Sequence, residues 1–262
     1  MRALSTAATG MAAQQLNVEV ISNNIANMNT VGYKSQRAQF QDLLYQDQEQ
    51  VGSQSDSSGT IVPTGLQVGS GVKAGSIYRI TTQGSMTQTS NPLDVAVQGI
   101  GYLQVQLPTG ETAYTRAGNL SVNNAGVIVT AQGYPVLPQI TVPSGATNVV
   151  ISQSGLVQAT LPSQTTPQTL GQFELASFVN EAGLEGLGGN LWQVSGASGP
   201  AVVGQPGTNG LGSLLQGYTE ASNVDAVGEV TNLIAAQRAY EMNSKVVTTA
   251  DQMLSTTVQE KS

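Results

Sequence analysis

The sequence predicts an α+β protein with a long helix at each end of the chain and a body of β-strands between them. Three observations carry this prediction. Apolar residues recur every seven positions near the N-terminus and again near the C-terminus, which is the pattern of helices that pair as a coiled coil. Between these ends, apolar and polar residues alternate in short runs separated by turns rich in glycine, asparagine and proline, which is typical of strands.

The N-terminal pattern predicts a helix over about residues 3–27. Two lines run along it three residues apart, one at Leu4, Met11, Val18 and Ile25, and the other at Ala7, Gln14, Ile21 and Met28. Arg2 and Glu19 are the only charged residues in this stretch, so the opposite face consists of uncharged polar side chains. Such a helix is poorly suited to permanent exposure, and we expect it to pack on other helices. An ordinary helix packed within a single chain is the alternative.

A second helix is expected over about residues 224–258, with an apolar line at Leu233, Tyr240, Val247 and Leu254. Gly228 interrupts its start, because glycine in a helix costs about 1 kcal/mol relative to alanine, so the helix could begin only after this residue. Heptad helices at both ends, and nowhere else, predict that the two termini meet. The two lines that start at Leu4 and Leu233 form the predicted self-assembly seam.

The body is expected to be all-β. Strands are expected at residues 77–80, 94–97, 103–107, 120–122, 127–129, 140–142, 149–151 and 173–178. Residues 1–32 and 222–262 then form a terminal helical assembly domain, residues 33–74 an extended arm or linker, and residues 75–221 the β-rich body. Within the arm, residues 46–71 are dense in glutamine, serine, glycine and aspartate, and a long stretch of this kind is usually functional or disordered. We expect an arm that neighbouring subunits order.

Composition narrows the chemistry that this chain can perform. Its 262 residues include no cysteine and no histidine, which excludes zinc sites of the usual kind, thiol chemistry and histidine-based triads. The net charge of −7 gives no electrostatic footprint for nucleic acid. No apolar run follows Arg2 as in a cleaved secretory signal, and the longest apolar runs are too short to span a bilayer. We expect no catalytic, cofactor-binding or metal-binding residues.

Two alternatives from other functional classes stay open. A carbohydrate-active enzyme would need a pair of carboxylates, for which the candidates are Asp94, Glu111, Glu174, Glu181, Glu185 and Glu220. Aromatic residues make up only 5% of the chain, so few could form a platform for a sugar, and the single tryptophan, Trp192, is expected in the core. A monomeric β-rich binding module with helical flanks is the other alternative.

Two motifs near the ends are more specific than any of these signals. The first, at residues 22–34, reads SNNIANMNTVGYK and contains Asn23, Asn24, Asn27, Thr30, Gly32 and Lys34. Asparagine favours helix ends, and glycine permits the chain to turn out of the helix. The second begins with QGY at residues 216–218 and contains Gln237, Arg238, Tyr240 and Asn243. These motifs resemble the N-terminal and C-terminal signatures of bacterial flagellar rod and hook proteins.

Three further stretches are similar to the same family. Residues 115–120 read TRAGNL, which matches a family block of the form TRxGxL. Residues 39–46 and 63–69 are similar to the corresponding stretches of the distal rod members, and the arm argues against the hook member. Another rod or hook member is the alternative within this class.

The resemblance implies a structural subunit rather than an enzyme. It implies a hollow tube of many copies, with paired terminal helices along the inner wall and the β body outside, which crosses the periplasm as a drive shaft in the flagellar basal body. The implied partners are further copies of the chain, proximal rod proteins, the hook protein, the surrounding periplasmic and outer-membrane ring proteins, and the type III export apparatus. Export would leave the N-terminus uncleaved, and the arm would stiffen the tube.

Overall fold

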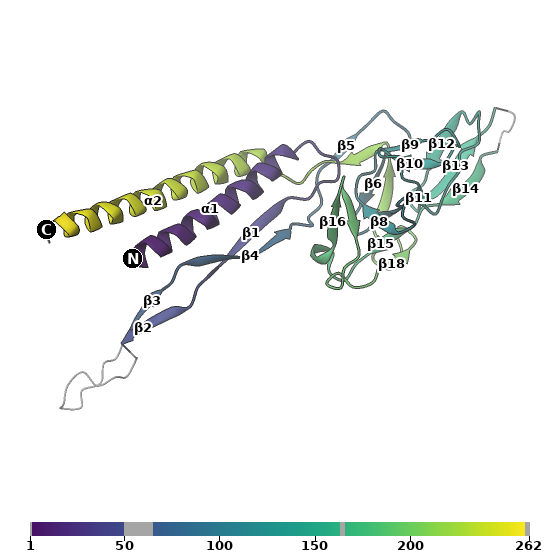
Figure 1. The fold of residues 1–262 in the computed structure, drawn as a ribbon. Coiled ribbons are helices and arrows are strands. Elements are labelled where there is room, and N and C mark those ends of the chain that lie inside the picture. The colour runs from purple at the N-terminus through teal and green to yellow at the C-terminus, as the bar shows by residue number, and fades with distance from the viewer. Residues whose placement is uncertain (1, 50–64, 163–165, 260–262) are drawn as a thin grey trace. The chain divides into compact units, whose positions relative to one another are not determined.

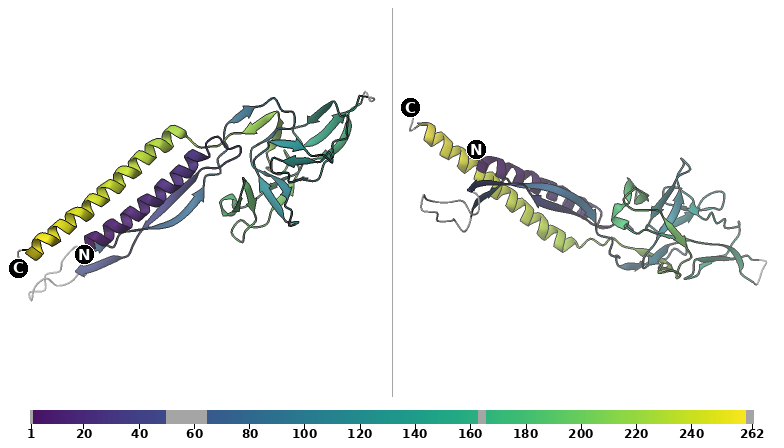
Figure 2. Two further views of the ribbon diagram at one scale, coloured as in Figure 1. Left: turned by 45° about the horizontal axis from the view of Figure 1, so that its top comes forward. Right: turned by 90° about the horizontal axis from the view of Figure 1, so that it is seen from below.

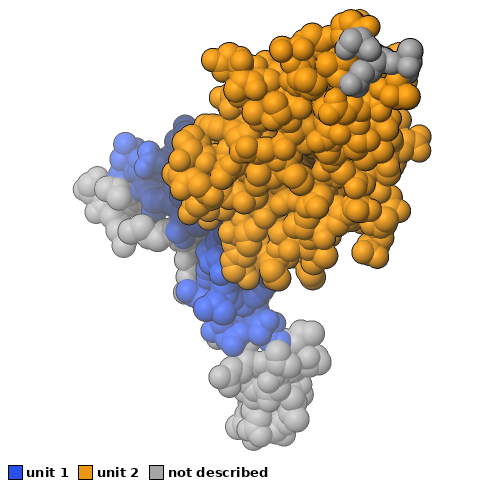
Figure 3. Space-filling model, turned by 90° about the vertical axis from the view of Figure 1, so that its right-hand side faces the viewer, with its two compact units in different colours: residues 1–25, 36–78, 226–262 blue, residues 26–35, 79–225 orange. Residues whose placement is uncertain are grey.

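The computed structural model describes residues 2–49, 65–162 and 166–259. They belong to two compact units, which Figure 3 shows in different colours. The helical unit consists of residues 1–25, 36–78 and 226–262, and the β unit consists of residues 26–35 and 79–225. Each unit is therefore assembled from segments that are far apart in the sequence.

The helical unit contains two long helices, α1 at Arg2–Ala26 and α2 at Ala226–Gln259, which lie side by side and run in opposite directions (Figure 1, Figure 2). Both helices expected from the heptad patterns are thus confirmed. Gly228 lies inside the first turn of α2, so this helix begins before the glycine and not after it. The local cost of one glycine is small beside the packing of a helix of 34 residues.

Two contacts fix the register of α1 against α2. The side-chain amide of Asn24 donates to Glu229 Oε1 at 2.9 Å. A Cβ added to Gly10 would lie 2.9 Å from the side-chain nitrogen of Asn243, so the helices approach closely there. The two contacts are fourteen residues apart on both helices and therefore belong to one antiparallel register.

A two-part strand ladder completes the helical unit. Strand β1 (Gln36–Asp42) pairs with β4 (Val72–Arg79), and β2 (Tyr45–Glu49) pairs with β3 (Leu66–Gly69). The ladder lies along α1, where the backbone N–H of Val72 donates to Thr9 Oγ1 at 3.4 Å and a side chain at Gly71 would collide with the same hydroxyl. The segment expected as an arm is thus paired strand where the structure describes it, and residues 50–64 lie outside the described part.

The β unit is built from short antiparallel strands. They are β5 (Met86–Gln88), β6 (Val95–Gln98), β7 (Tyr102–Gln106), β8 (Thr112–Thr115), β9 (Leu120–Val122), β10 (Ile128–Thr130), β11 (Val136–Leu137), β12 (Asn148–Ile151), β13 (Leu156–Thr160), β14 (Gln168–Gln172), β15 (Leu175–Ser177), β16 (Glu185–Gly188), β17 (Leu191–Gln193), β18 (Val202–Gly204), β19 (Ser213–Gln216) and β20 (Tyr218–Glu220), with a 3₁₀ turn at Glu181–Gly183. The main sheet has the order β16-β17-β8-β7-β15-β18, and β11 also pairs with β7. Smaller sheets pair β9 with β10, β6 with β19, β5 with β20, and β12 with β13 and β14.

The central strands of the main sheet are buried on both faces, whereas the outer strands β16 and β18 are largely exposed. Side chains alternate along its strands, so that Leu103, Ala113, Leu175 and Leu191 join the larger core, whereas Tyr102, Tyr114, Ala176 and Trp192 join a smaller aromatic one. In the smaller core, the rings of Tyr114 and Phe178 meet edge to face with centroids 4.8 Å apart. The alternation of apolar residues with glutamines along β7 predicts one exposed face, yet Gln104 is buried because the aromatic cluster covers that face.

Seven of the eight expected strands lie on observed ones. The exception is residues 140–142, where Thr141 forms only an isolated bridge with Val127. Pro138 and Pro143 flank this stretch, and proline has no N–H to donate to a ladder. Ile140 nevertheless points into the larger core, so its apolar character reflects burial rather than strand structure.

Gly118 allows two segments of the β unit to touch. The backbone N–H of Val95 donates to Gly118 O at 2.9 Å, and a Cβ at Gly118 would lie 1.6 Å from Val95 O. We expect Gly118→Ala to destabilise the β unit by about 3 kcal/mol, the upper end of what overpacking costs. Gly196→Ala is the matched control, because a Cβ there meets no atom within 4 Å. Thermal unfolding followed by the fluorescence of Trp192, the only tryptophan, measures the difference, and equal midpoints would contradict the expectation.

Candidate assembly surface

Helix α2 buries little of itself within its own chain. Ala236 is the one apolar residue of its described part that is fully buried. Large apolar side chains are exposed along its length, at Val227, Val230, Ile234, Tyr240, Met242, Val246, Met253 and Leu254. Their exposed fractions run from 42% at Tyr240 to 77% at Val227. Most of the stability of a helix comes from packing of its apolar face. The exposed apolar face of α2 is therefore suited to bind another protein chain.

Helix α1 is better covered, because it contacts both α2 and the strand ladder. Its most buried apolar side chains are Ala7, Ala13, Val20 and Ile21. Ala7 and Ile21 belong to the second line seen in the sequence, and the other two each precede a position of that line. The first line, which contributes to the predicted seam, is only half-buried.

The eight seam residues lie on the two helices of one unit. Leu4, Met11, Val18, Ile25, Leu233 and Val247 are half-buried, and Tyr240 and Leu254 are exposed. All eight thus keep apolar surface that is open to another chain. Their pairing as a coiled coil stays a prediction.

A buried charge cluster in the β unit brings together three motifs that are far apart in the sequence. Glu220 is fully buried, and its carboxylate accepts from Lys34 Nζ at 2.5 Å and from Arg116 Nε at 2.9 Å. The backbone N–H of Gly84 adds a third bond at 3.0 Å to the same carboxylate. Arg116 also donates through Nη1 to the carbonyl oxygens of Gly99 and Gly101. One carboxylate therefore compensates two cations, which would be costly to bury alone.

Lys34 shows how finely this compensation is balanced. Burial lowers the pKa of its ammonium group, and the hydrogen bond and charge of Glu220 oppose that shift. The nearby guanidinium of Arg116 lowers the pKa of Lys34 further. Lys34 Nζ also donates to Thr82 O at 2.9 Å, so the cation is bonded on two sides.

The loop before Lys34 fits the same cluster through its backbone. Gly32 has φ +71°, its N–H donates to Glu220 O at 2.8 Å, and a Cβ there would lie 2.8 Å from the backbone of Arg116 and Ala117. Thr30 Oγ1 donates to Asn27 Oδ1 at 3.1 Å, which closes the turn at the helix end. In this motif Lys34 therefore binds the carboxylate of Glu220, Gly32 binds the main chain of the same residue, and Thr30 with Asn27 closes the turn before them.

Two asparagine side chains bind the backbone at the start of β1, which follows Lys34. Within the β unit, Asn223 Oδ1 accepts from the N–H of Ser35 at 2.7 Å, and its nitrogen donates to Ile80 O and Thr82 O. Within the helical unit, Asn24 Oδ1 accepts from the N–H of Gln36 at 2.9 Å while Asn24 Nδ2 donates to Gln36 O. Each side-chain amide thus substitutes for a strand neighbour.

The remaining motif residues lie on the surface of the helices. Gln237 and Arg238 are exposed on α2, Asn23 is exposed on α1, and Asn243 is half-buried against Gly10. Sequence reasoning named Lys34 but did not connect it with Arg116 and Glu220. The signal was available, since all three are single charges within largely uncharged motifs of a chain with only 10% charged residues.

The carboxylates considered for glycoside hydrolysis lie in different environments. Glu220 is held in its ion pairs, and Asp94 is buried where Asn91 donates to it at 2.8 Å. Glu181 accepts from the hydroxyl of Tyr102 at 3.1 Å, and burial together with that charge raises the pKa of this phenol. Glu111 and Glu185 are exposed, and Glu174 is half-buried. Trp192 is buried as expected, with the guanidinium of Arg79 stacked 3.4 Å from the ring centroid.

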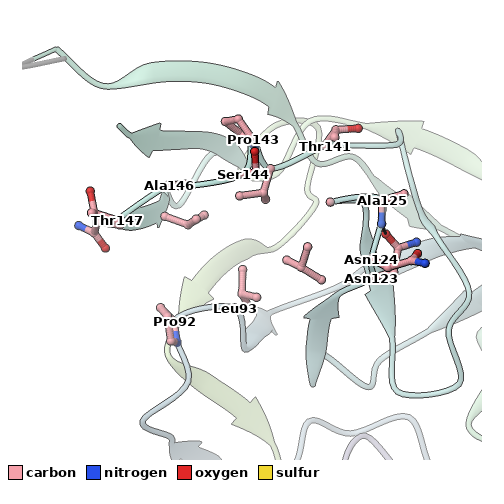
Figure 4. A pocket seen from close by; sticks show the side chains of 16 residues that line it. Pro92, Leu93, Asn123, Asn124, Ala125, Thr141, Pro143, Ser144, Ala146 and Thr147 are labelled. Carbon is pink, nitrogen blue, oxygen red and sulfur yellow. Dashed lines mark hydrogen bonds between the residues drawn. The ribbon is translucent and has the colours of Figure 1, made fainter. Parts of the chain in front are cut away.

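A pocket of about 700 Å³ opens in the β unit between the turn after β9 and the loop at residues 141–149 (Figure 4). Its lining contains no ionisable side chain. Asn123 is engaged by its own turn, since its side-chain oxygen accepts from the N–H groups of Ala125 and Val127. The pocket therefore offers neutral hydrogen-bonding groups and apolar surface.

Two kinds of feature are absent from the described residues. No cluster of three or more acidic side chains could hold a metal ion in the part of the chain that the structure describes. No described helix is both long enough and apolar enough to cross a membrane.

We expect Glu220→Gln to destabilise the β unit by about 3–5 kcal/mol, because it leaves two buried cations without a counter-charge. Glu111→Gln removes the same charge from an exposed side chain and should leave stability within about 0.5 kcal/mol of the parent. Urea unfolding monitored by Trp192 fluorescence measures both variants. A midpoint of Glu220→Gln that matches the parent would show that the cluster contributes little.

Three stretches of the chain match known protein families. Residues 4–34 match the flagella basal body rod protein family, and residues 96–159 match the D1 domain of flagellar hook protein FlgE/F/G. Residues 215–260 match the C-terminal region of the flagellar basal body rod FlgEFG proteins. These matches contain Lys34, Arg116 and Glu220, one residue each, so the buried cluster joins the three family regions.

Whole proteins agree with these matches. The chain is 66% identical over 262 residues, covering 100% of both chains, to the flagellar basal-body rod protein FlgG of Caulobacter vibrioides. It is 50% identical over 255 residues, 97% of both chains, to that of Agrobacterium fabrum, and 44% identical over 256 residues, 97% of this chain and 96% of the relative, to that of Borreliella burgdorferi. The chain therefore belongs to the family of flagellar basal-body rod proteins, as a structural subunit of the FlgG-like, distal rod type.

Proposed function

We propose that many copies of this chain polymerise through their terminal helices into a rigid, hollow drive shaft. The shaft transmits torque from the motor to the hook and encloses part of the export channel. The observation that carries this proposal is the uncovered apolar surface of α2. In this assembly, residues 1–32 and 222–262 form the polymerising part, residues 33–74 the arm, and residues 75–221 the outer body.

Torque transmission needs contacts that do not slide. Within and between copies, Leu4, Met11, Val18 and Ile25 pack on Leu233, Tyr240, Val247 and Leu254. Each aliphatic side chain that becomes buried contributes about 1.5–3 kcal/mol, which is offset in part by the entropy lost when the helices become ordered. Helices of 25 and 34 residues repeat such contacts along their length, so no single contact needs to be strong.

The arm supplies a second set of contacts. Leu44 and Tyr45, where the strand ladder passes from β1 to β2, are 88% and 57% exposed, and Leu66 and Val68 of β3 are exposed as well. Apolar side chains at this density on a narrow ladder are suited to insertion between neighbouring copies. An arm held in this way stiffens the tube.

The remaining partners follow from a place in the basal body. The shaft meets proximal rod proteins at one end and the hook protein at the other, and periplasmic and outer-membrane ring proteins surround it. The chain reaches that place through the flagellar type III export apparatus with its N-terminus uncleaved, and it needs no cofactor. The end-to-end similarity to basal-body rod proteins supports this placement.

Val247→Asp should prevent rod formation without unfolding the β unit, because a charge on the seam cannot be covered by another chain. Val247→Leu keeps the site apolar and should support normal rods. The measurement is electron microscopy of hook–basal bodies from cells that carry only the variant, with Trp192 fluorescence of the purified protein as the folding check. Normal rods built from Val247→Asp subunits would rule out this seam.

Deletion of residues 46–67 should permit export and assembly but give a more flexible polymer, because it removes Leu66 and most of the β2–β3 pairing that positions the other apolar side chains of the arm. Bending of isolated rods in electron micrographs measures the change. A chain that lacks these residues and forms no rod at all would show instead that the arm is a folding element.

A further inference from the structure

A groove between the two helices carries two carboxylates that form no ion pair with the described residues. This helix groove has a volume of about 350 Å³ and is lined by Gln15, Val18 and Glu19 of α1 and by Gln237, Tyr240 and Glu241 of α2. Val18 and the ring of Tyr240 give it an apolar floor. Tyr240 is 42% exposed and both carboxylates are exposed, so the groove is open to an incoming side chain.

The two carboxylates find no cation within the described part of the chain. Glu19 accepts from Gln15 Nε2 at 3.2 Å, which is a neutral partner. The ion pairs among the described residues both involve Glu220 of the β unit. A groove with an aromatic floor and two carboxylates at its rim is suited to a guanidinium group, which stacks on aromatic rings and binds carboxylates with its planar fork.

Arg238 has the complementary properties. It is exposed, and none of the described residues forms an ion pair with it. It precedes Tyr240 by two residues, and at about 100° per residue on an α-helix the two side chains point in nearly opposite directions. Arg238 therefore faces away from the aromatic floor of the groove in its own chain.

We propose that Arg238 of one copy inserts into the helix groove of a second copy, between Glu19 and Glu241 and over the ring of Tyr240. This inference rests on the proposed polymerisation and names one of its contacts. Since the donor and the groove are different parts of the subunit surface, the contact is heterologous, and such contacts propagate into open filaments unless a rotation closes them into a ring.

The test uses two variants that fail alone and complement each other. Arg238→Glu gives a copy with an anionic donor and the parent groove. Glu19→Lys combined with Glu241→Lys gives a copy with the parent donor and a cationic groove. Each variant alone places like charges together, whereas alternating copies of the two pair every donor with a groove of opposite charge.

Cells that lack the parent gene would express each variant alone, both together, or the parent. We expect rods and swimming to be lost with either variant alone and to return when both are expressed. Glu111→Lys is the matched control, because it reverses an exposed charge of the β unit, outside both helices, and it should assemble as the parent does. Trp192 fluorescence and helical circular dichroism of each purified variant confirm folding.

Co-expression also separates this contact from pairing within one helix. Arg238 and Glu241 are three residues apart and could pair in the same chain, but mixing copies cannot repair a pair inside either variant. Failure of the mixture to restore rods, or normal rods from either variant alone, would overturn the inference while leaving the proposed polymerisation intact. If the parent chain itself formed no rods, the proposed function would fail with it.

Discussion

The carboxylate of Glu220 is the point on which the β unit depends. It compensates Lys34 and Arg116 together, and all three side chains are buried. A buried ion pair is not in general a strong source of stability, but removing one member of an existing pair is costly, because an uncompensated charge is then left inside. The cluster therefore ties three segments of the chain to one arrangement. These charges make other arrangements of the three segments costly, and they contribute less to the net stability of the native fold.

The helices and most of the strands could be predicted because their signals are local. Spacing of seven residues gives α1 and α2, and alternation gives strands such as β7 and β9. The second buried face of the main sheet could not be read in this way, since Gln104 looks like a surface residue until the aromatic cluster covers it. The strand predicted at residues 140–142 was wrong for the opposite reason. The apolar side chains there are partly or fully buried, but the flanking prolines prevent a strand and leave only an isolated bridge.

In the candidate site, too, the features with a local sequence signal could be predicted and the long-range contacts could not. The seam positions on α1 and α2 follow from periodicity, but the stripe that α1 buries is displaced from the first predicted line because the strand ladder covers another side of that helix. The contacts of Lys34, Arg116 and Glu220 join positions 34, 116 and 220, and no local pattern relates such distant residues. Lys34 and Arg116 lie in family motifs and Glu220 was considered as a catalytic carboxylate, so only the folded chain assigns these three residues a common role.

Arg238 and the aromatic floor of the helix groove point in nearly opposite directions, and this has a consequence for the ends of a polymer. A chain of copies joined donor to groove is directional, so its two ends are chemically unlike. One end presents a row of free guanidinium groups, and the other presents acidic grooves with aromatic floors. A protein that adjoins the first end needs acidic recesses, and one that adjoins the second needs projecting cations. A single subunit type could then be bounded by two different neighbours without either being able to replace the other.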